Sequence, residues 1–118
     1  MNAMDNQQNS FSNNNLKNYT LTLCQDINVF IADRDLKKPS TINHHSSTYL
    51  KTSYDYKRET LGLFVKNFSE KIANCCSEFE KRRVIIDPML KSRVNNPTTI
   101  LMITAEIIPS LHSLANQL

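Results

Sequence analysis

The residues that could perform chemistry in this chain begin with two vicinal histidines, His44 and His45, and two vicinal cysteines, Cys75 and Cys76. Imidazole nitrogens and thiolates bind zinc, and they also act as bases and nucleophiles. Vicinal histidines usually point apart, however, and no acidic or thiol ligand follows this pair at a recognised metal-binding spacing. We therefore expect the histidines to lie at the surface of a loop, without a metal.

The cysteines could supply a thiolate nucleophile, with His112 as its base. Cys75 nevertheless continues an apolar helical stripe, and buried cysteines pack as small, inert hydrophobic groups. Cys24 makes the total odd, which argues against a disulfide framework and favours a reducing compartment. Cys75 and Cys76 are accordingly predicted to belong to the core.

The acidic residues Asp26, Asp33 and Asp35 could in principle form a general acid–base pair. They lie on the polar side of an amphipathic segment, with Arg34 and Lys37 close by in the sequence. Mixed charge at this spacing is typical of a solvated helix face. No catalytic residue is predicted.

The basic residues are best clustered at Lys81, Arg82 and Arg83, where a phosphate or an acidic protein surface could bind. Basic side chains also suit the C-terminal end of a helix, whose dipole they complement. The net charge of +3 is too small to indicate nucleic acid by itself. Gly62 is the only glycine, so neither a P-loop nor a dinucleotide-binding turn can be formed, and no cofactor is expected.

The elements that position these residues are predicted from hydrophobic periodicity. Residues 1–14 are rich in Asn, Gln and Ser and predict a disordered polar tail, and residues 15–118 predict a single helical domain. Apolar residues at spacings of three and four predict main helices near 15–35, 47–83 and 97–117. Asp87 and Pro88 open a short turn that ends at Lys91 or Ser92. The predicted fold is all-α, an elongated antiparallel bundle of three main helices.

The middle segment carries the longest stripe, formed by Leu50, Tyr54, Lys57, Leu61, Phe64, Phe68, Ile72, Cys75 and Phe79. A helix over these residues is too long for a compact domain of this size, so it is either broken or part of an elongated bundle. The segment contains more aromatic residues than a single helical stripe can bury, and Tyr49 and Tyr56 project away from the stripe. With Lys57 and Arg58 beside them, they are predicted to bind a partner protein.

The last segment is apolar on more than one side. Pro109 interrupts it and predicts a kink. Leu101, Met102 and Ile108 lie off its main apolar face and are predicted to form the interface of a two-fold homodimer.

Together, the Asn-rich tail, the segment TSYDYKRETLGLFVKNFSEKI and the last segment TTILMITAEIIPSLHSL resemble a known class of protein. They are similar in size and helical layout to small all-helical inhibitors that intracellular bacterial pathogens encode beside effectors that deamidate or transglutaminate the ubiquitin machinery. The resemblance implies a non-enzymatic dimer that binds such effectors and blocks their access to substrate. It assigns no individual functional residue.

These observations predict a non-enzymatic, protein-binding regulator, foremost an inhibitor of a partner enzyme. A secretion chaperone or adaptor for effector proteins is the nearest alternative, and a nucleic-acid-binding helical protein is the second. The N-terminal residues lack a secretory signal, and no apolar run is long enough to span a bilayer. We therefore expect a cytoplasmic protein without a membrane contact, which a specialised secretion system could export to a host cell.

Overall fold

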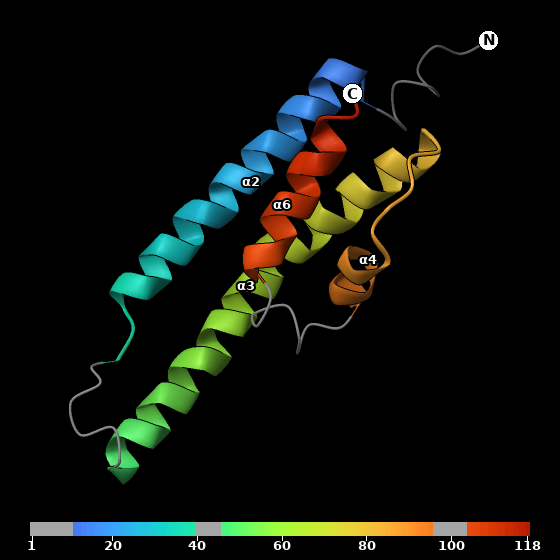
Figure 1. The fold of residues 1–118 in the computed structure, drawn as a ribbon. Helices are drawn as coiled ribbons and strands as arrows, with labels where there is room; N and C mark the ends of the chain where they lie inside the picture. The colour runs from blue at the N-terminus through green and yellow to red at the C-terminus, as the bar shows by residue number, and fades with distance from the viewer. Residues whose placement is uncertain (1–10, 40–45, 96–103) are drawn as a thin grey trace.

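The computed structural model describes residues 11–39, 46–95 and 104–118. Within these ranges the chain forms helices and no strand, which confirms the predicted all-α class (Figure 1). The helices are α2 (Asn13–Leu36), α3 (Ser47–Lys81), α4 (Pro88–Asn95) and α6 (Thr104–Ala115). The described residues thus hold four helices where three main helices were predicted.

Helix α2 begins at Asn13, two residues before its predicted start. The hydroxyl oxygen of Ser12 accepts a hydrogen bond from the backbone N–H of Asn15 at 3.1 Å, so Ser12 is the N-cap. One side of the helix is buried, with Leu16, Thr20, Leu23, Cys24 and Ile27 facing the core. The helix ends at Leu36, shortly before Pro39, as the proline predicts.

The predicted tail of residues 1–14 is too long at its C-terminal boundary. Phe11 packs against Tyr19 with ring centroids 5.1 Å apart, and its backbone N–H donates to the Glu78 carboxylate at 3.3 Å. Arg82 donates to the carbonyl oxygen of Phe11 and to Oδ1 of Asn13. These contacts order residues 11–14, and the rest of the predicted tail lies outside the described residues.

Helix α3 is continuous over 35 residues, or about 52 Å, and agrees with the long helix predicted over 47–83. Ser46 is its N-cap and accepts a hydrogen bond from the Tyr49 N–H at 3.0 Å. Arg83, just after the helix, adopts a left-handed conformation with φ of 60°. The continuous helix makes the molecule elongated, with extents of 65 × 23 × 21 Å.

Gly62 lies in the middle of α3 at an exposed position, and a Cβ atom added there meets nothing within 4 Å. Glycine loses more backbone freedom on folding than alanine does. Gly62→Ala is therefore expected to raise the free energy of unfolding by about 0.5–1 kcal/mol. Urea denaturation measures the change, and an unchanged or lower value would contradict the reason given.

The C-terminal half departs most from the prediction. Helix α4 fills the place of the short turn predicted after Asp87 but continues to Asn95. Helix α6 begins at Thr104, and residues 96–103, where the last helix was predicted to start, lie outside the described residues. The helix continues through Pro109, so the proline does not end it. The kink at Pro109 stays a prediction.

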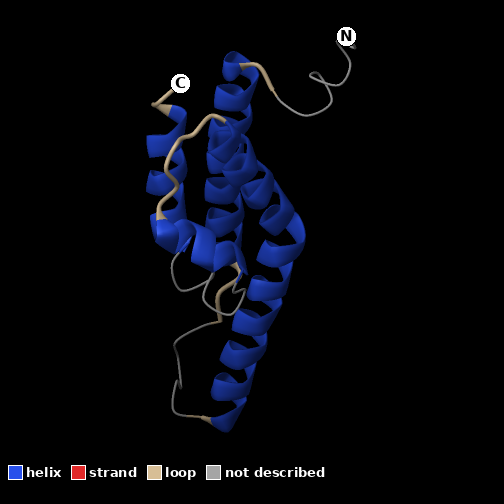
Figure 2. Ribbon diagram, turned by 90° about the vertical axis from the view of Figure 1, so that its right-hand side faces the viewer, coloured by secondary structure: helices blue, strands red, loops and turns tan. Residues whose placement is uncertain are grey.

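The core lies in one half of the molecule. Helices α2 and α3 run antiparallel, and α6 lies beside α2 and α4 beside α3 at the end where the N-terminus of α2 meets the C-terminus of α3 (Figures 1 and 2). The buried cluster is formed by Leu16, Leu23, Cys24, Ile27, Phe64, Phe68, Ile72, Cys75, Cys76, Phe79, Ile86, Leu90, Ile107, Leu111 and Leu114. At the other end, α2 and α3 lie side by side without α4 or α6 (Figure 1). No described helix has the length and apolar character needed to cross a membrane.

Candidate protein-binding surface

Cys75 and Cys76 are buried in the core, as predicted, and Cys24 is buried there as well. Burial raises the pKa of the Cys24, Cys75 and Cys76 thiols to about 11 in each case. The Cys75 sulfur lies 3.5 Å from the hydroxyl oxygen of Thr20. At neutral pH these groups are therefore protonated thiols, which are poor nucleophiles and poor metal ligands.

Metal-binding residues do not come together within the described ranges, where no group of three or more His, Cys, Asp or Glu side chains could hold an ion. His44 and His45 lie outside these residues. His112 is on the exposed side of α6. The aspartates of α2 are exposed, and Asp33 pairs with a lysine one turn later at 3.1 Å.

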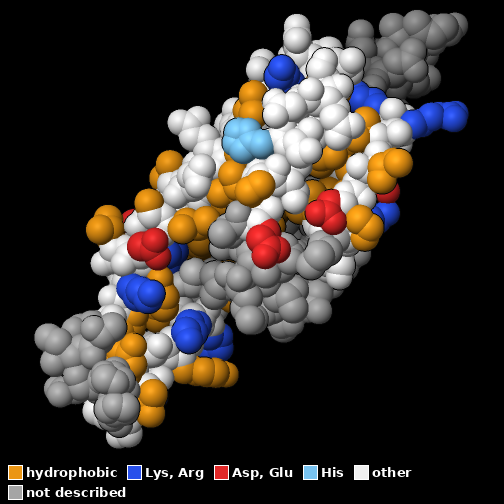
Figure 3. All heavy atoms as spheres, viewed as in Figure 1, with side chains coloured by type: hydrophobic (Ala, Val, Ile, Leu, Met, Phe, Trp, Pro, Cys, Tyr) orange, Lys and Arg blue, Asp and Glu red, His pale blue; other side chains and the backbone are white. Residues whose placement is uncertain are grey.

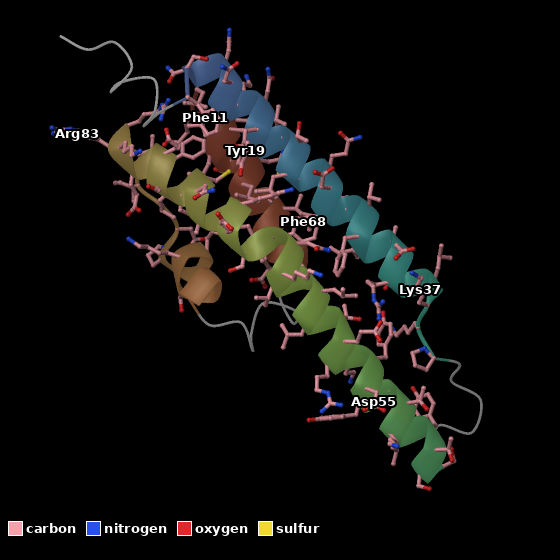
Figure 4. All side chains as sticks on the ribbon, turned by 180° about the vertical axis from the view of Figure 1, so that it is seen from behind. Phe11, Tyr19, Lys37, Asp55, Phe68 and Arg83 are labelled. Carbon is pink, nitrogen blue, oxygen red and sulfur yellow. The ribbon has the colours of Figure 1, made fainter. Side chains whose placement is uncertain are left out.

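The basic cluster at the end of α3 serves the fold. Lys81 and Arg82 both donate to the carboxylate of Glu78, at 2.9 and 3.1 Å. Arg83 extends away from the bundle at the end of α3 (Figure 4). Arg83 is exposed, and none of the ion pairs found among the described residues includes its side chain.

One of the four predicted partner-binding residues, Tyr56, contacts α2. Tyr49 and Tyr56 are half-buried, and the Tyr56 hydroxyl donates to the backbone carbonyl of Arg34 at 2.6 Å. The Arg34 guanidinium lies over the Tyr56 ring, 4.9 Å from its centroid. Lys57 and Arg58 are exposed. The aromatic excess that the sequence shows is thus partly used in packing α2 against α3.

Arg34 itself was not predicted to be buried. Its side chain is 8% exposed, and it donates to the Thr60 hydroxyl at 2.8 Å and to the Glu59 carboxylate at 3.1 Å. The available signal was its spacing, because Arg34 follows Ile27 at the interval of seven that the core face of α2 repeats. At the end of the molecule that lacks α4 and α6, these polar contacts of Arg34 join α2 to α3 in place of an apolar core.

The exposed large hydrophobic residues of α3 belong to the first half of the long stripe. We define the α3 stripe as Leu50, Tyr54, Lys57 and Leu61. Leu50 is 58% exposed and Tyr54 63% exposed, whereas Phe64 on the same helix face is fully buried. Helices α4 and α6 cover only the second half of α3, and α2 packs against the neighbouring face through Tyr56 and Thr60. Leu61 is partly buried against the core, so among the described residues the exposed part of the α3 stripe is Leu50, Tyr54 and Lys57.

Charged groups border the α3 stripe. The Arg58 guanidinium lies 5.4 Å from the centroid of the Tyr54 ring, and Arg58 also pairs with Asp55 at 3.3 Å. Figure 3 shows hydrophobic and basic side chains together on the face in view at this end of the molecule, and Figure 4 places Asp55 and Lys37 there. The combination of an aromatic ring, an arginine and apolar residues is typical of energetically important positions in protein interfaces.

The predicted dimer interface on the last helix is described only at Ile108. This residue is half-buried and packs against the core, and its carbonyl oxygen lies 3.9 Å from the Cys24 sulfur. Leu101 and Met102 lie outside the described residues. Part of the Ile108 side chain is thus already in contact with the core of its own chain.

Among the described residues, the surface pockets near the core include the following two. One, of 360 Å³, lies between α2 and α3 and is lined by Phe11, Asn15, Asn18, Tyr19, Thr22, Leu23, Asp26 and Lys71. The other, of 450 Å³, lies between α6 and the segment that precedes α4. Its lining residues include Ile85, Pro88 and Pro109. Asp26 and Lys71 are the charged residues of the first pocket and Asp87 that of the second. Neither pocket contains a histidine or cysteine.

Comparison of the chain with models of known protein families, with curated protein sequences and with solved structures finds no match.

Proposed function

We propose that this chain is a non-enzymatic regulator that binds another protein through the α3 stripe, foremost an inhibitor that blocks a partner enzyme's access to its substrate. The observation that carries the proposal is the exposure of Leu50 and Tyr54 on a helix face whose continuation forms the core. Exposure of such an apolar face to water is unfavourable. Burial against the apolar surface of a partner protein removes the face from water and is therefore favourable.

The composition of the surface supports a protein ligand. Tyr54 offers a ring that is apolar on its face and polar at its hydroxyl, and Arg58 and Lys57 can contact carboxylates at the rim. A broad, convex helix face suits another folded surface better than it suits a small molecule, which binds in a concave pocket. Under this proposal, Lys57 and Arg58 keep their predicted role, and Leu50 and Tyr54 replace Tyr49 and Tyr56.

The resemblance to inhibitors of effectors that modify the ubiquitin machinery supplies a candidate partner class. In this proposal the chain works as an elongated bundle of three main helices with α4 as an addition, bent at Pro109. The proposed location is the cytoplasm, or a host cell after export by a specialised secretion system. Fractionation of source cells tests the location.

Site-specific photo-crosslinking tests the function. A photoreactive phenylalanine analogue at position 54 should capture an enzyme from source cells, and the same analogue at position 36, an exposed position at the C-terminal end of α2, should not. The unmodified chain should suppress the captured enzyme's turnover, and Leu50→Glu should abolish the suppression while helicity stays unchanged. Capture of secretion substrates, kept competent for export, would replace the inhibitor with the chaperone. Salt-dependent retention on nucleic acid without protein capture would reject both.

A further inference from the structure

We propose that the segment between α3 and α4 binds an extended peptide of another protein, which adds to the segment as a β-strand in the groove beside α6. We call residues 84–87 the α3–α4 connection; their sequence is VIID. The connection follows the C-terminal end of α3, whereas the exposed part of the α3 stripe lies in the N-terminal half of that helix. The inference therefore goes beyond the proposed function and gives the chain a second binding surface.

The α3–α4 connection has the conformation that strand pairing needs. Its residues form neither helix nor turn, and Figures 1 and 2 show the chain running back along the bundle from the end of α3 to α4. Val84, Ile85 and Ile86 are β-branched and favour an extended backbone, and the proline after Asp87 keeps that residue out of the helical region. Burial alternates as in a strand, since Val84 is half-buried, Ile85 is 88% exposed and Ile86 is 8% exposed.

The backbone of the α3–α4 connection has hydrogen-bonding groups to offer a peptide. The Val84 N–H donates to the carbonyl oxygen of Phe79 at 3.1 Å, at the end of α3. None of the hydrogen bonds found among the described residues includes the N–H or C=O of Ile85 or Ile86. An added strand pairs with such groups. The partner segment must itself be extended, because a helix uses its own N–H and C=O groups internally.

The groove between the α3–α4 connection and α6 has space for such a peptide. Its volume is 450 Å³, which is within the range of about 300–1,000 Å³ that is usual for ligand sites. Its lining includes the buried apolar side chains of Ile86, Leu90 and Leu114, and Ile85 lies at the exposed edge. A peptide in the groove thus has an apolar surface beneath it and the open backbone of the connection beside it.

The α6 side of the groove carries polar side chains at a helical spacing. Ser110, Ser113 and Gln117 line the groove and follow one another at intervals of three and four residues. Within the described part of the chain, their side chains take part in no hydrogen bond. The row is about 10 Å long, which is the length of three extended residues. A peptide that pairs with the connection along one edge therefore meets hydroxyl and amide groups along its other edge.

The exposed residues of the surface select the composition of the peptide. Ile85 is covered best by a β-branched side chain on the strand opposite. Arg83 immediately precedes the α3–α4 connection, and its exposed side chain extends away from the bundle (Figure 4). A carboxylate next to the apolar part of the peptide can accept charged hydrogen bonds from the Arg83 guanidinium. The ligand is thus an extended peptide with β-branched residues and an acidic residue at one end.

Fluorescence anisotropy tests the binding with a short labelled peptide that alternates threonine and isoleucine and begins with an aspartate. Anisotropy should rise as the full chain is added up to about 1 mM, the range of weak binding. Ile85→Glu should weaken the binding about tenfold or more, because it removes the apolar contact. Leu36→Glu is the matched control, since Leu36 on α2 is also 88% exposed, and this variant should bind as the unmutated chain does.

A second peptide distinguishes strand pairing from apolar contact alone. Methylation of alternate backbone nitrogens keeps the side chains but removes N–H donors, so the methylated peptide should not bind. The amide protons of Ile85 and Ile86 should also exchange about tenfold more slowly when the unmodified peptide is present at about ten times its Kd. Equal binding of the methylated peptide, or unchanged exchange at both residues, would overturn the strand pairing.

A charge exchange tests the acidic preference. Arg83→Glu should weaken binding of the aspartate peptide several-fold and favour a peptide with lysine in place of the aspartate. The same preference in the unmutated chain and in Arg83→Glu would remove Arg83 from the site.

Absence of an anisotropy rise with the unmutated chain, or a rise that Ile85→Glu leaves unchanged, would overturn the whole inference. Circular dichroism of each variant establishes that a loss of binding is not a loss of folding. Capture at position 54 is independent of these results, so the proposed function is tested separately.

Discussion

Phe64→Ala should lower the free energy of unfolding by about 3–5 kcal/mol, the cost usual for a fully buried phenylalanine. Phe64 has no exposed surface, and its ring lies 5.9 Å from the Phe30 centroid and 5.2 Å from the Phe68 centroid. Phe30 and Phe68 are themselves 5.4 Å apart, so the three rings form one cluster that joins α2 to α3. Removing the Phe64 ring leaves a cavity between two long helices that cannot easily move together.

Urea denaturation followed by circular dichroism measures this loss, which is a large part of the total stability of a domain of this size. Leu36→Ala provides the matched control, since this side chain is 88% exposed and its truncation should change the free energy by less than about 0.5 kcal/mol. A cost below about 1 kcal/mol for Phe64→Ala would mean that the cluster is not packed as described.

The helices could be predicted from the sequence because the features that specify a helix are local. Ser46 caps α3, the three-and-four spacing continues from Phe64 to Phe79, and Pro88 starts α4. Each of these features acts within one or two helical turns, where periodicity and capping are decisive. The start of α2 was predicted two residues late because the cap is Ser12, while the neighbouring asparagines are equally suitable capping residues.

Burial was predicted less well, because it depends on contacts between distant segments. The periodicity of α3 does not distinguish Leu50 from Phe64, although one is 58% exposed and the other fully buried. The difference arises from where α4 and α6 end, which no local pattern in α3 encodes. The burial of Arg34 and Glu78 was likewise not predicted, and both are buried because they have partners on another helix or in the residues before α2.

Glu78 joins the residues before α2 to the C-terminal end of α3. Its side chain is 10% exposed and accepts hydrogen bonds from Lys81 at 2.9 Å, from Arg82 at 3.1 Å and from the Phe11 backbone at 3.3 Å. Arg82 in turn donates to Asn13 at 2.9 Å. The carboxylate therefore holds the residues before α2 against the end of α3. A neutral amide in its place accepts fewer and weaker hydrogen bonds.

The free energy of unfolding at acidic pH should depend on the protonation of the Glu78 carboxylate. Burial by itself would raise the pKa of Glu78, but the hydrogen bonds from Lys81, Arg82 and Phe11 outweigh it and hold the pKa below the ordinary value of 4.5. The unfolded chain then binds more protons than the folded chain as the pH falls below 4.5. The stabilisation is consequently complete above that pH and is lost as the pH falls through the lowered pKa of the folded state.

Glu78→Gln should lower the free energy of unfolding at pH 7 by about 1–3 kcal/mol, the range for a buried group that loses charged hydrogen bonds. It should also flatten the dependence on pH between 4.5 and the acid transition, because the titrating group is absent. Glu59→Gln is the matched control: Glu59 also pairs with an arginine on a helix but is 65% exposed, so its loss should cost no more than about 1 kcal/mol at pH 7. Urea denaturation at a series of pH values gives both quantities. If Glu78→Gln and the unmutated chain showed the same slope below pH 4.5, the carboxylate would not be bound by its three donors, and the ordering of residues 11–14 would need another cause.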